Sequence, residues 1–179
     1  MGIRWKIDPT WTLFLDRDGV INERIFGSYV LKKEDFHFTK DCLVALKKAQ
    51  GIFGRIVVVT NQQCVALELI TEKELEDLHD FMIQEIQKEG GRIDMVYCAT
   101  ELKSAKAARR KPSMNMGLEA LSDFPEIDFK KSIMIGDTDS DLQFGMNLGM
   151  KTVLIESKEP TKLIPDMCVK SLNEWMLLL

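Results

Sequence analysis

WTLFLDRDGV, at residues 11–20, is apolar as far as Leu15 and then turns polar at once. A short apolar run rich in aromatic and β-branched residues is typical of a strand buried on both faces, as in a parallel sheet. We therefore predict a strand at Trp11–Leu15, with Asp16 to Gly19 just beyond its carboxyl end. In α/β proteins ligands bind outside the carboxyl ends of the parallel strands, so these polar residues are the first candidates for a site.

The same pattern recurs along the chain and predicts the fold class. Further strands are predicted at Arg55–Thr60, Asp94–Cys98, Ser132–Ile135 and Thr152–Ile155. Helices are predicted at Lys40–Gln50, from the capping box Thr71/Glu74 to just before Gly90, at Met114–Leu121 and at Asp139–Leu148, and Ser171–Leu179 is predicted as a short amphipathic helix docked on the protein. This alternation predicts an α/β fold, a doubly wound, Rossmann-like parallel sheet with helices on both faces, as a single domain over residues 1–179.

Composition limits the classes of partner. The chain has 179 residues, with 24 basic and 28 acidic side chains and a net charge of −4, which gives no electrostatic footprint for a nucleic acid. No segment resembles a signal peptide or approaches the roughly 18 apolar residues of a membrane span. Four cysteines lie far apart without a C-x-x-C pair and are interpreted as free thiols. We expect a cytoplasmic monomer that binds neither nucleic acid nor membrane.

Polar residues follow four of the predicted strands in a recognisable order. They are Asp16-Arg17-Asp18-Gly19 after the first strand, Thr60-Asn61-Gln62 at the second, Arg109-Arg110-Lys111-Pro112 beyond the third, and Gly136-Asp137-Thr138-Asp139-Ser140-Asp141 after the fourth. This set resembles the four motifs of the haloacid dehalogenase superfamily, over most of the chain. The resemblance implies a phosphatase that forms an aspartyl phosphate.

The chemistry of that reaction assigns roles to these residues. A carboxylate with an ordinary pKa near ~4 is ionised at neutral pH, so Asp16 can attack phosphorus without an activating base. Asp18 is expected to protonate the leaving alkoxide and then to activate the hydrolytic water. An anionic nucleophile approaching a phosphate needs positive charge, which Lys111 and Mg²⁺ fit. By resemblance, the Mg²⁺ ligands are the carboxylate of Asp16, the backbone carbonyl of Asp18 and the carboxylate of Asp137.

Other residues have weaker assignments with alternatives. Asp141 is expected either to ligate Mg²⁺ through water or to hold Lys111. Thr60 should donate its hydroxyl to a phosphate oxygen and Asn61 should shape the pocket, although the pair could simply cap a helix. Asp139 is interpreted as a helix N-cap rather than a metal ligand. His37 and His79 lack the spacing of a metal pair and are interpreted as structural.

Four segments narrow the resemblance to one branch of the superfamily. They are Leu13–Asn22, Tyr29-Val30, Thr60–Gln63 and Arg110-Lys111-Pro112, and they resemble the branch of D-glycero-D-manno-heptose 1,7-bisphosphate phosphatase and histidinol phosphatase. The resemblance implies short loops instead of a large cap domain. It also implies that the substrate-binding residues are Arg17, Gly19, Asn22, Tyr29, Asn61 and Arg110.

Two departures from the branch affect the expected substrate and metal. Cys98 lacks the Cys and His partners that hold a structural zinc in many members, so zinc is not expected. Residues 64–68, Cys-Val-Ala-Leu-Glu, replace a stretch that is usually glycine-rich and basic. The leading hypothesis is a phosphatase of heptose 1,7-bisphosphate, in carbohydrate metabolism. The alternatives are a phosphatase of histidinol phosphate or another small phosphomonoester, and a binding protein of low turnover, which Glu68 would favour.

Overall fold

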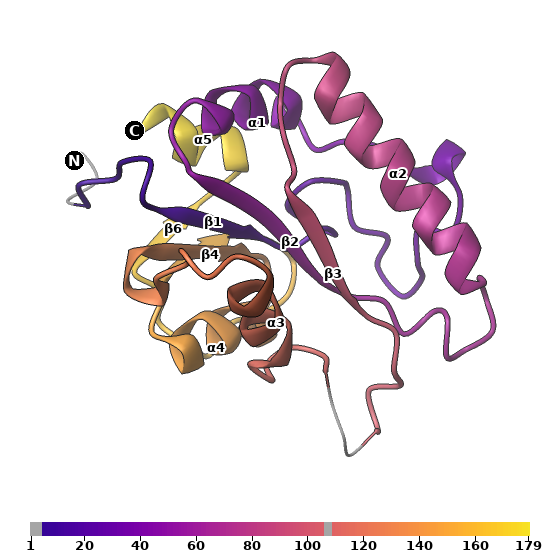
Figure 1. Ribbon diagram of the computed structural model, residues 1–179. Coiled ribbons are helices and arrows are strands. Elements are labelled where there is room, and N and C mark those ends of the chain that lie inside the picture. Colours follow the sequence, from indigo (N-terminus) through magenta and orange to yellow (C-terminus); the bar gives the residue numbers. More distant parts are fainter. Residues whose placement is uncertain (1–4, 106–108) are drawn as a thin grey trace.

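The fold is a parallel sheet between two layers of helices (Figure 1). The computed structural model describes residues 5–105 and 109–179. The strands are β1 (Thr12–Leu15), β2 (Arg55–Asn61), β3 (Met95–Ala99), β4 (Ser132–Gly136), β5 (Lys151–Ile155) and β6 (Met167–Val169), arranged in the order β3-β2-β1-β4-β5-β6. Every neighbouring pair is parallel. The predicted doubly wound α/β fold is confirmed, and the described residues include no separate cap domain.

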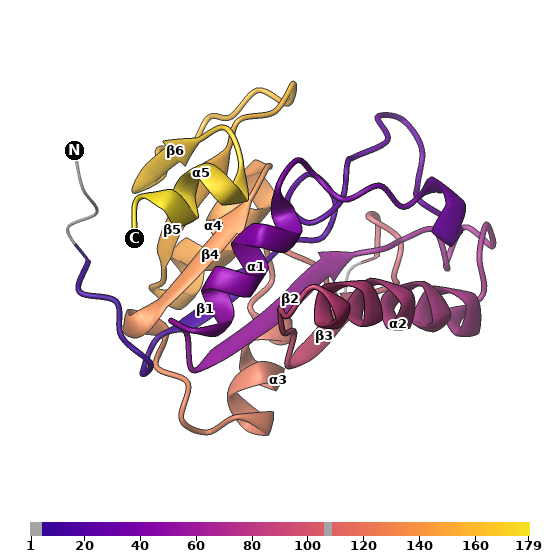
Figure 2. The same cartoon turned by 90° about the horizontal axis from the view of Figure 1, so that it is seen from above.

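The helices divide between the two faces of the sheet. They are α1 (Cys42–Gln50), α2 (Glu72–Lys88), α3 (Asn115–Asp123), α4 (Asp139–Leu148) and α5 (Leu172–Leu177), with short 3₁₀ turns η1 (Lys33–Asp35) and η2 (Phe129–Lys131). Figures 1 and 2 show α1, α2 and α5 on one face and α3 and α4 on the other. None of the helices in the described ranges has the length and apolar character to cross a bilayer.

Strand β1 explains why both layers form. Its residues are all buried, and the side chains alternate between two apolar cores because successive side chains in a strand point to opposite faces. Leu13 and Leu15 pack in the core beneath α1, α2 and α5. Phe14 packs in the other core, where it meets Phe144 of α4 with ring centroids 6.4 Å apart. A strand buried on both faces needs residues that tolerate burial at every position, and here three apolar residues follow the buried Thr12.

The sheet order places the site. The chain runs outward from β1 through β2 to β3 and then restarts at β4 on the other side of β1. The loops after β1 and β4 therefore lead to helices on opposite faces, which leaves a crevice at the carboxyl ends of these neighbouring strands. Asp16 follows β1 directly, and Asp137 follows β4 directly.

Several predicted boundaries differ from the structure. Strand β6 was not predicted, since its three residues carry too short a pattern. Helix α1 begins at Cys42 rather than Lys40, because Asp41 adopts a left-handed conformation with φ of 58°. The last helix ends at Leu177, with Ser171 as its N-cap, so it is shorter than Ser171–Leu179.

Candidate active site

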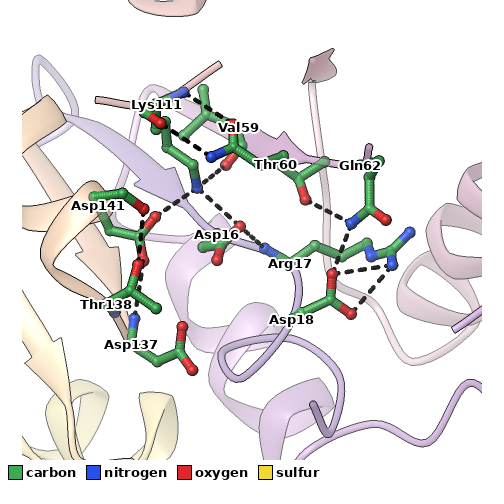
Figure 3. Close-up of polar contacts among 12 residues, drawn as sticks. Asp16, Arg17, Asp18, Val59, Thr60, Gln62, Lys111, Asp137, Thr138 and Asp141 are labelled. Atoms are coloured by element: carbon green, nitrogen blue, oxygen red, sulfur yellow. Dashed lines mark hydrogen bonds and ion pairs between the residues drawn. The ribbon is translucent and has the colours of Figure 1, made fainter. Parts of the chain in front are cut away.

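The ion-paired centre of the site is Lys111, which lies between two carboxylates (Figure 3). Its Nζ atom is 2.9 Å from Asp16 Oδ1 and 2.6 Å from Asp141 Oδ1, and it donates to the Val59 carbonyl at 2.5 Å. The lysine is 2% exposed. Burial alone would lower the pKa of Lys111, but Asp141 and Asp16 outweigh it and raise the pKa, so the side chain stays charged.

Asp141 is fixed by the beginning of α4. Its Oδ2 atom accepts hydrogen bonds from the backbone N–H groups of Asp137 and Thr138 and from the Thr138 hydroxyl. Thr138 is the N-cap of α4, so the interpretation of Asp139 as the N-cap is wrong. Asp139 instead accepts hydrogen bonds from Thr161 and Lys162 and ties down the loop after β5. The geometry favours Asp141 as the residue that holds Lys111.

Three carboxylates form a compact cluster suited to a hard divalent cation. Asp16, Asp137 and Asp141 each offer an oxygen, and these oxygens lie within 4.8 Å of one another. Asp137 Oδ1 is buried without a hydrogen-bond partner among the described residues. A Cβ atom on Gly19 would lie 2.4 Å from Asp137 Oδ2, so the close approach of this loop requires glycine. All-oxygen donors with one oxygen left open fit Mg²⁺.

The cluster changes the electrostatics expected for the nucleophile. Burial, reinforced by Asp141 and opposed by Lys111, raises the pKa of Asp16 to about 7. Burial and Asp141 likewise raise the pKa of Asp137 to about 6, although the guanidinium of Arg24 opposes the shift. The expectation of an ordinary pKa near ~4 for Asp16 is therefore wrong for the metal-free protein. A cation among the carboxylates would favour their ionised forms.

Asp18 is held from several sides. Arg17 Nη2 donates to both of its oxygens at 3.1 and 3.0 Å, Asn22 donates to Oδ1 at 2.9 Å, and Gln62 donates to Oδ2 at 2.6 Å. Burial acts to raise the pKa of Asp18, but Arg17 and the hydrogen bonds from Asn22 outweigh it, so the pKa lies below its usual range. This arrangement stabilises the carboxylate form of Asp18.

Arg17 and Asn22, predicted as substrate-binding residues, lie behind Asp18. Both are fully buried and neither lines the cleft, so the geometry favours a role in holding Asp18. Arg17 Nη1 lies 3.2 Å from Nε2 of His79 on α2. Because arginine can only donate, His79 Nε2 accepts and the ring is neutral. Burial, reinforced by Arg17, lowers the pKa of His79 to about 3, which agrees with that tautomer.

The residues of the second motif lie at the end of β2. Thr60 is 1% exposed, and its hydroxyl accepts a hydrogen bond from Gln62 at 2.9 Å. Asn61 lines the cleft and exchanges two hydrogen bonds with the backbone of Lys111, at 2.9 and 3.2 Å. The helix-capping alternative for Thr60-Asn61 is not what the structure has, because both residues belong to β2 and α2 is capped by Thr71.

A cleft of about 360 Å³ lies above these residues and is bordered by loops. Tyr29 lines it and accepts a hydrogen bond from Gln63 at 2.6 Å. Arg110 also lines it, and its Nη1 atom is buried without a hydrogen-bond partner among the described residues. Arg109 instead pairs with Glu119 and donates to the Cys98 carbonyl, so these groups hold its guanidinium away from the cleft lining.

Sequence reasoning missed two cations of the cleft, Arg24 and Lys103. Both belong to loops, where no motif or periodicity marks them. Arg24 Nη1 donates to Asp137 Oδ2 at 3.1 Å, and Nη2 lies 3.6 Å from Glu159. The charge of Arg24, so soon after the D-x-D-G motif, was the only available signal.

The atypical segment at residues 64–68 does not border the cleft within the described part of the chain. Glu68 is exposed and adopts a left-handed conformation with φ of 56°, in a turn whose Leu69 N–H donates to the Cys64 carbonyl. Glu68 is therefore not among the described residues that line the cleft, and it gives no direct support to the alternative of a binding protein with low turnover.

Comparison with known proteins places the chain among phosphatases. A family model described as HAD-hydrolase-like matches residues 108–175. The chain is 34% identical over 151 residues to D-glycero-beta-D-manno-heptose-1,7-bisphosphate 7-phosphatase of Helicobacter pylori, covering 84% of this chain and 85% of the relative. It is 36% identical over 150 residues to the D-glycero-alpha-D-manno-heptose-1,7-bisphosphate 7-phosphatase of Campylobacter jejuni, covering 84% of each.

Solved structures agree on the fold. D,D-heptose 1,7-bisphosphate phosphatase from B. bronchiseptica, complexed with magnesium and phosphate, matches with a TM-score of 0.81 and 22% identity, over 94% of this chain and 96% of that one. The Burkholderia thailandensis enzyme of the same name matches with a TM-score of 0.67 and 27% identity, over 93% and 96%. The fold is therefore shared with these proteins.

Proposed function

We propose that this chain, a phosphatase of the haloacid dehalogenase-like hydrolases in the branch of the heptose 1,7-bisphosphate 7-phosphatases, acts on a heptose bisphosphate. It removes the 7-phosphate of a D-glycero-D-manno-heptose 1,7-bisphosphate and uses Mg²⁺ as cofactor. The observation that carries the proposal is the pairing of Asp16 with buried Lys111, beside the open oxygen of Asp137. Three carboxylates so close together, two of them buried, are typical of a functional site.

Asp16 is the proposed nucleophile. Its carboxylate oxygen forms a bond to phosphorus while the bond from phosphorus to the sugar oxygen breaks, which leaves an aspartyl phosphate. Lys111 offsets negative charge on the transferring group and keeps Asp16 in position. Asp16, the Asp18 carbonyl and Asp137 would hold Mg²⁺, which supplies positive charge between the nucleophile and the phosphate. Thr60 and Asn61 are proposed to contact the phosphate and shape its pocket.

Asp18 is the general acid and then the general base of the proposed reaction. Its acid form gives a proton to the leaving sugar oxygen, and its carboxylate then takes a proton from the water that attacks the aspartyl phosphate. The hydrogen bonds from Arg17, Asn22 and Gln62 stabilise the carboxylate, so they support the second step directly. The first step requires Asp18 to be protonated, and therefore to loosen its contact with Arg17, as the substrate binds.

The charge of the cleft supports a bisphosphate. Arg24, Lys103 and Arg110 line it, against Glu159 as an acidic residue of the loops. Arg110 is proposed to bind the distal phosphate, since its buried Nη1 lacks a partner among the described residues. Histidinol phosphate carries an ammonium group that these cations would repel. The charge balance therefore favours the heptose bisphosphate over that alternative.

A substrate panel tests the proposal. Turnover with Mg²⁺ is compared for both anomers of heptose 1,7-bisphosphate, the corresponding monophosphates, histidinol phosphate and p-nitrophenyl phosphate, and Asp16→Asn serves as the inactive control. We expect the highest kcat/KM for one of the bisphosphate anomers. A preference for histidinol phosphate would contradict the substrate assignment, and Mg²⁺-independent turnover would contradict the cofactor.

We also propose that the enzyme works in the cytoplasm as a monomer and needs no zinc. The net charge of −4 supports the absence of a nucleic-acid partner. Size-exclusion chromatography with light scattering tests the monomer, and elemental analysis of the purified protein tests the metal. One tightly bound zinc per chain would contradict the proposed metal content.

A further inference from the structure

Arg24 connects the metal-binding carboxylates to the rim of the cleft. Its Nη1 atom donates to Asp137 Oδ2 at 3.1 Å, and its Nη2 atom lies 3.6 Å from Glu159 Oε1. Asp137 is almost fully buried, whereas the Arg24 side chain is 31% exposed and lines the cleft. The guanidinium therefore reaches from the solvent side onto a proposed metal ligand.

The side chains around Arg24 contact the loop after β5. The guanidinium lies 5.7 Å from the centroid of the Phe26 ring, and Lys158 Nζ lies 5.6 Å from the same centroid. Phe26 is 48% exposed and also lines the cleft. These contacts join the loop after β1 to the loop after β5 across the opening. Because both partners of Arg24 other than Asp137 are exposed, the side chain can turn without disturbing the core.

The charges around the cluster offer Arg24 two alternative anionic partners, first Asp137 and later a bound phosphate. When all three are ionised, Asp16, Asp137 and Asp141 contribute three negative charges, which face two positive charges on Lys111 and Arg24. A divalent cation placed among these carboxylates repels the nearby guanidinium and competes with it for Asp137. A phosphate dianion entering the cleft then offers a new anionic partner to the displaced guanidinium.

We propose that Arg24 is a substrate-binding residue that occupies Asp137 until metal and phosphate arrive and then moves to the phosphate. It is thereby a specificity-determining residue of the phosphate site, outside the motifs that identify the fold. The inference rests on the proposed function for the metal ligand Asp137. It predicts that Arg24 weakens binding of metal alone and strengthens binding of phosphate to the metal-loaded protein.

Isothermal titration of Arg24→Gln with MgCl₂, and then with inorganic phosphate at saturating Mg²⁺, tests both halves. Without the competing charge, Mg²⁺ should bind about fivefold more tightly than to the wild type. Phosphate should bind about tenfold more weakly, as for the loss of one charge-assisted hydrogen bond. Arg24→Lys keeps the charge without the forked geometry, so we expect smaller changes in the same directions.

Lys158→Gln is the matched control, since it removes a cation that contacts Phe26 without touching Asp137. Its Mg²⁺ affinity should stay within about twofold of the wild type, as expected for a screened surface charge. Weaker or unchanged Mg²⁺ binding by Arg24→Gln would overturn the proposal, because Arg24 would then support the ligand or be indifferent to it. Unchanged phosphate affinity would overturn it as well. Neither measurement requires turnover, so both test Arg24 even if the substrate proposed above is wrong.

Discussion

The site has a floor and a rim that are built differently. The floor consists of Asp16, Lys111, Asp137 and Asp141. The rim consists of Arg24, Lys103, Arg110 and Glu159. Asp16 directly follows β1, Asp137 directly follows β4 and Asp141 lies in the first turn of α4. Lys111, Asp137 and Asp141 are buried, Asp16 is largely buried, and ion pairs join Lys111 to Asp16 and Asp141. Rim residues come from loops and are exposed or half-buried. The difference suggests that the reaction depends on the rigid floor and the choice of substrate on the adaptable rim.

Removing the nucleophile of the floor should cause the largest loss of activity. Asp16→Asn cannot attack phosphorus, so we expect kcat to fall by at least about a thousandfold while the fold is kept. Steady-state assays and circular dichroism measure the two properties. Retention of more than a few per cent of activity would show that another group attacks.

Breaking the buried ion pairs should cost stability as well as activity. Lys111→Met leaves Asp16 and Asp141 without their shared cation, so the free energy of unfolding should fall by about 3–5 kcal/mol in the absence of metal. Urea unfolding measures it. The matched variant Lys103→Met removes a rim lysine that is exposed, and it should change stability by less than about 0.5 kcal/mol. Similar losses in both variants would erase the distinction between floor and rim.

The rim is tested by a substrate comparison. Arg110→Ala should raise KM for the bisphosphate by roughly 10- to 100-fold, the equivalent of a charge-assisted hydrogen bond, and leave KM for a monophosphate much less changed. Arg109→Ala is the control, because Arg109 is paired with Glu119 and does not line the cleft. Equal effects of Arg110→Ala on the two substrates would remove the distal phosphate site.

Substitution of His79 tests whether this residue positions Asp18 by holding Arg17, which lies behind Asp18. His79→Leu removes the acceptor for Arg17 Nη1, and we expect about a tenfold loss of kcat/KM with sugar phosphates. The loss should be much smaller with p-nitrophenyl phosphate, whose leaving group needs no proton. His79→Gln keeps an acceptor and should recover most of the activity. An equal loss with both substrates would mean that His79 only supports the fold.

The raised pKa values predict that the stability of the metal-free protein depends on pH. Asp16, with a pKa raised to about 7, and Asp137, with a pKa raised to about 6, hold protons in the folded state that the unfolded state releases near pH 4. Raising the pH from 4 to about 7 therefore favours unfolding, and we expect Tm to fall over this range. Mg²⁺ should restore Tm at pH 8 and have little effect at pH 5. Thermal scans with and without MgCl₂, with Asp16→Asn as control, measure this.

Site residues were easiest to predict from the sequence where they directly follow a strand. Asp16 and Asp137 could be located because each directly follows an apolar run that can only be a buried strand. Arg17 was predicted to bind the substrate, since a sequence does not tell which way a side chain points. The structure places it behind Asp18, against His79, which α2 brings in from a distant part of the chain.

The alternating strands and helices, the family and the types of residue at the strand ends could all be predicted from the sequence, because they depend on local patterns of apolar and polar residues. The contact of Asp141 with Lys111, the anchoring of a loop by Asp139, the absence of Glu68 from the described cleft lining and the reach of Arg24 to Asp137 all depend on how distant segments pack. The physical reason is that burial and loop paths bring charges together across large separations in sequence, and those contacts set both pKa values and partners.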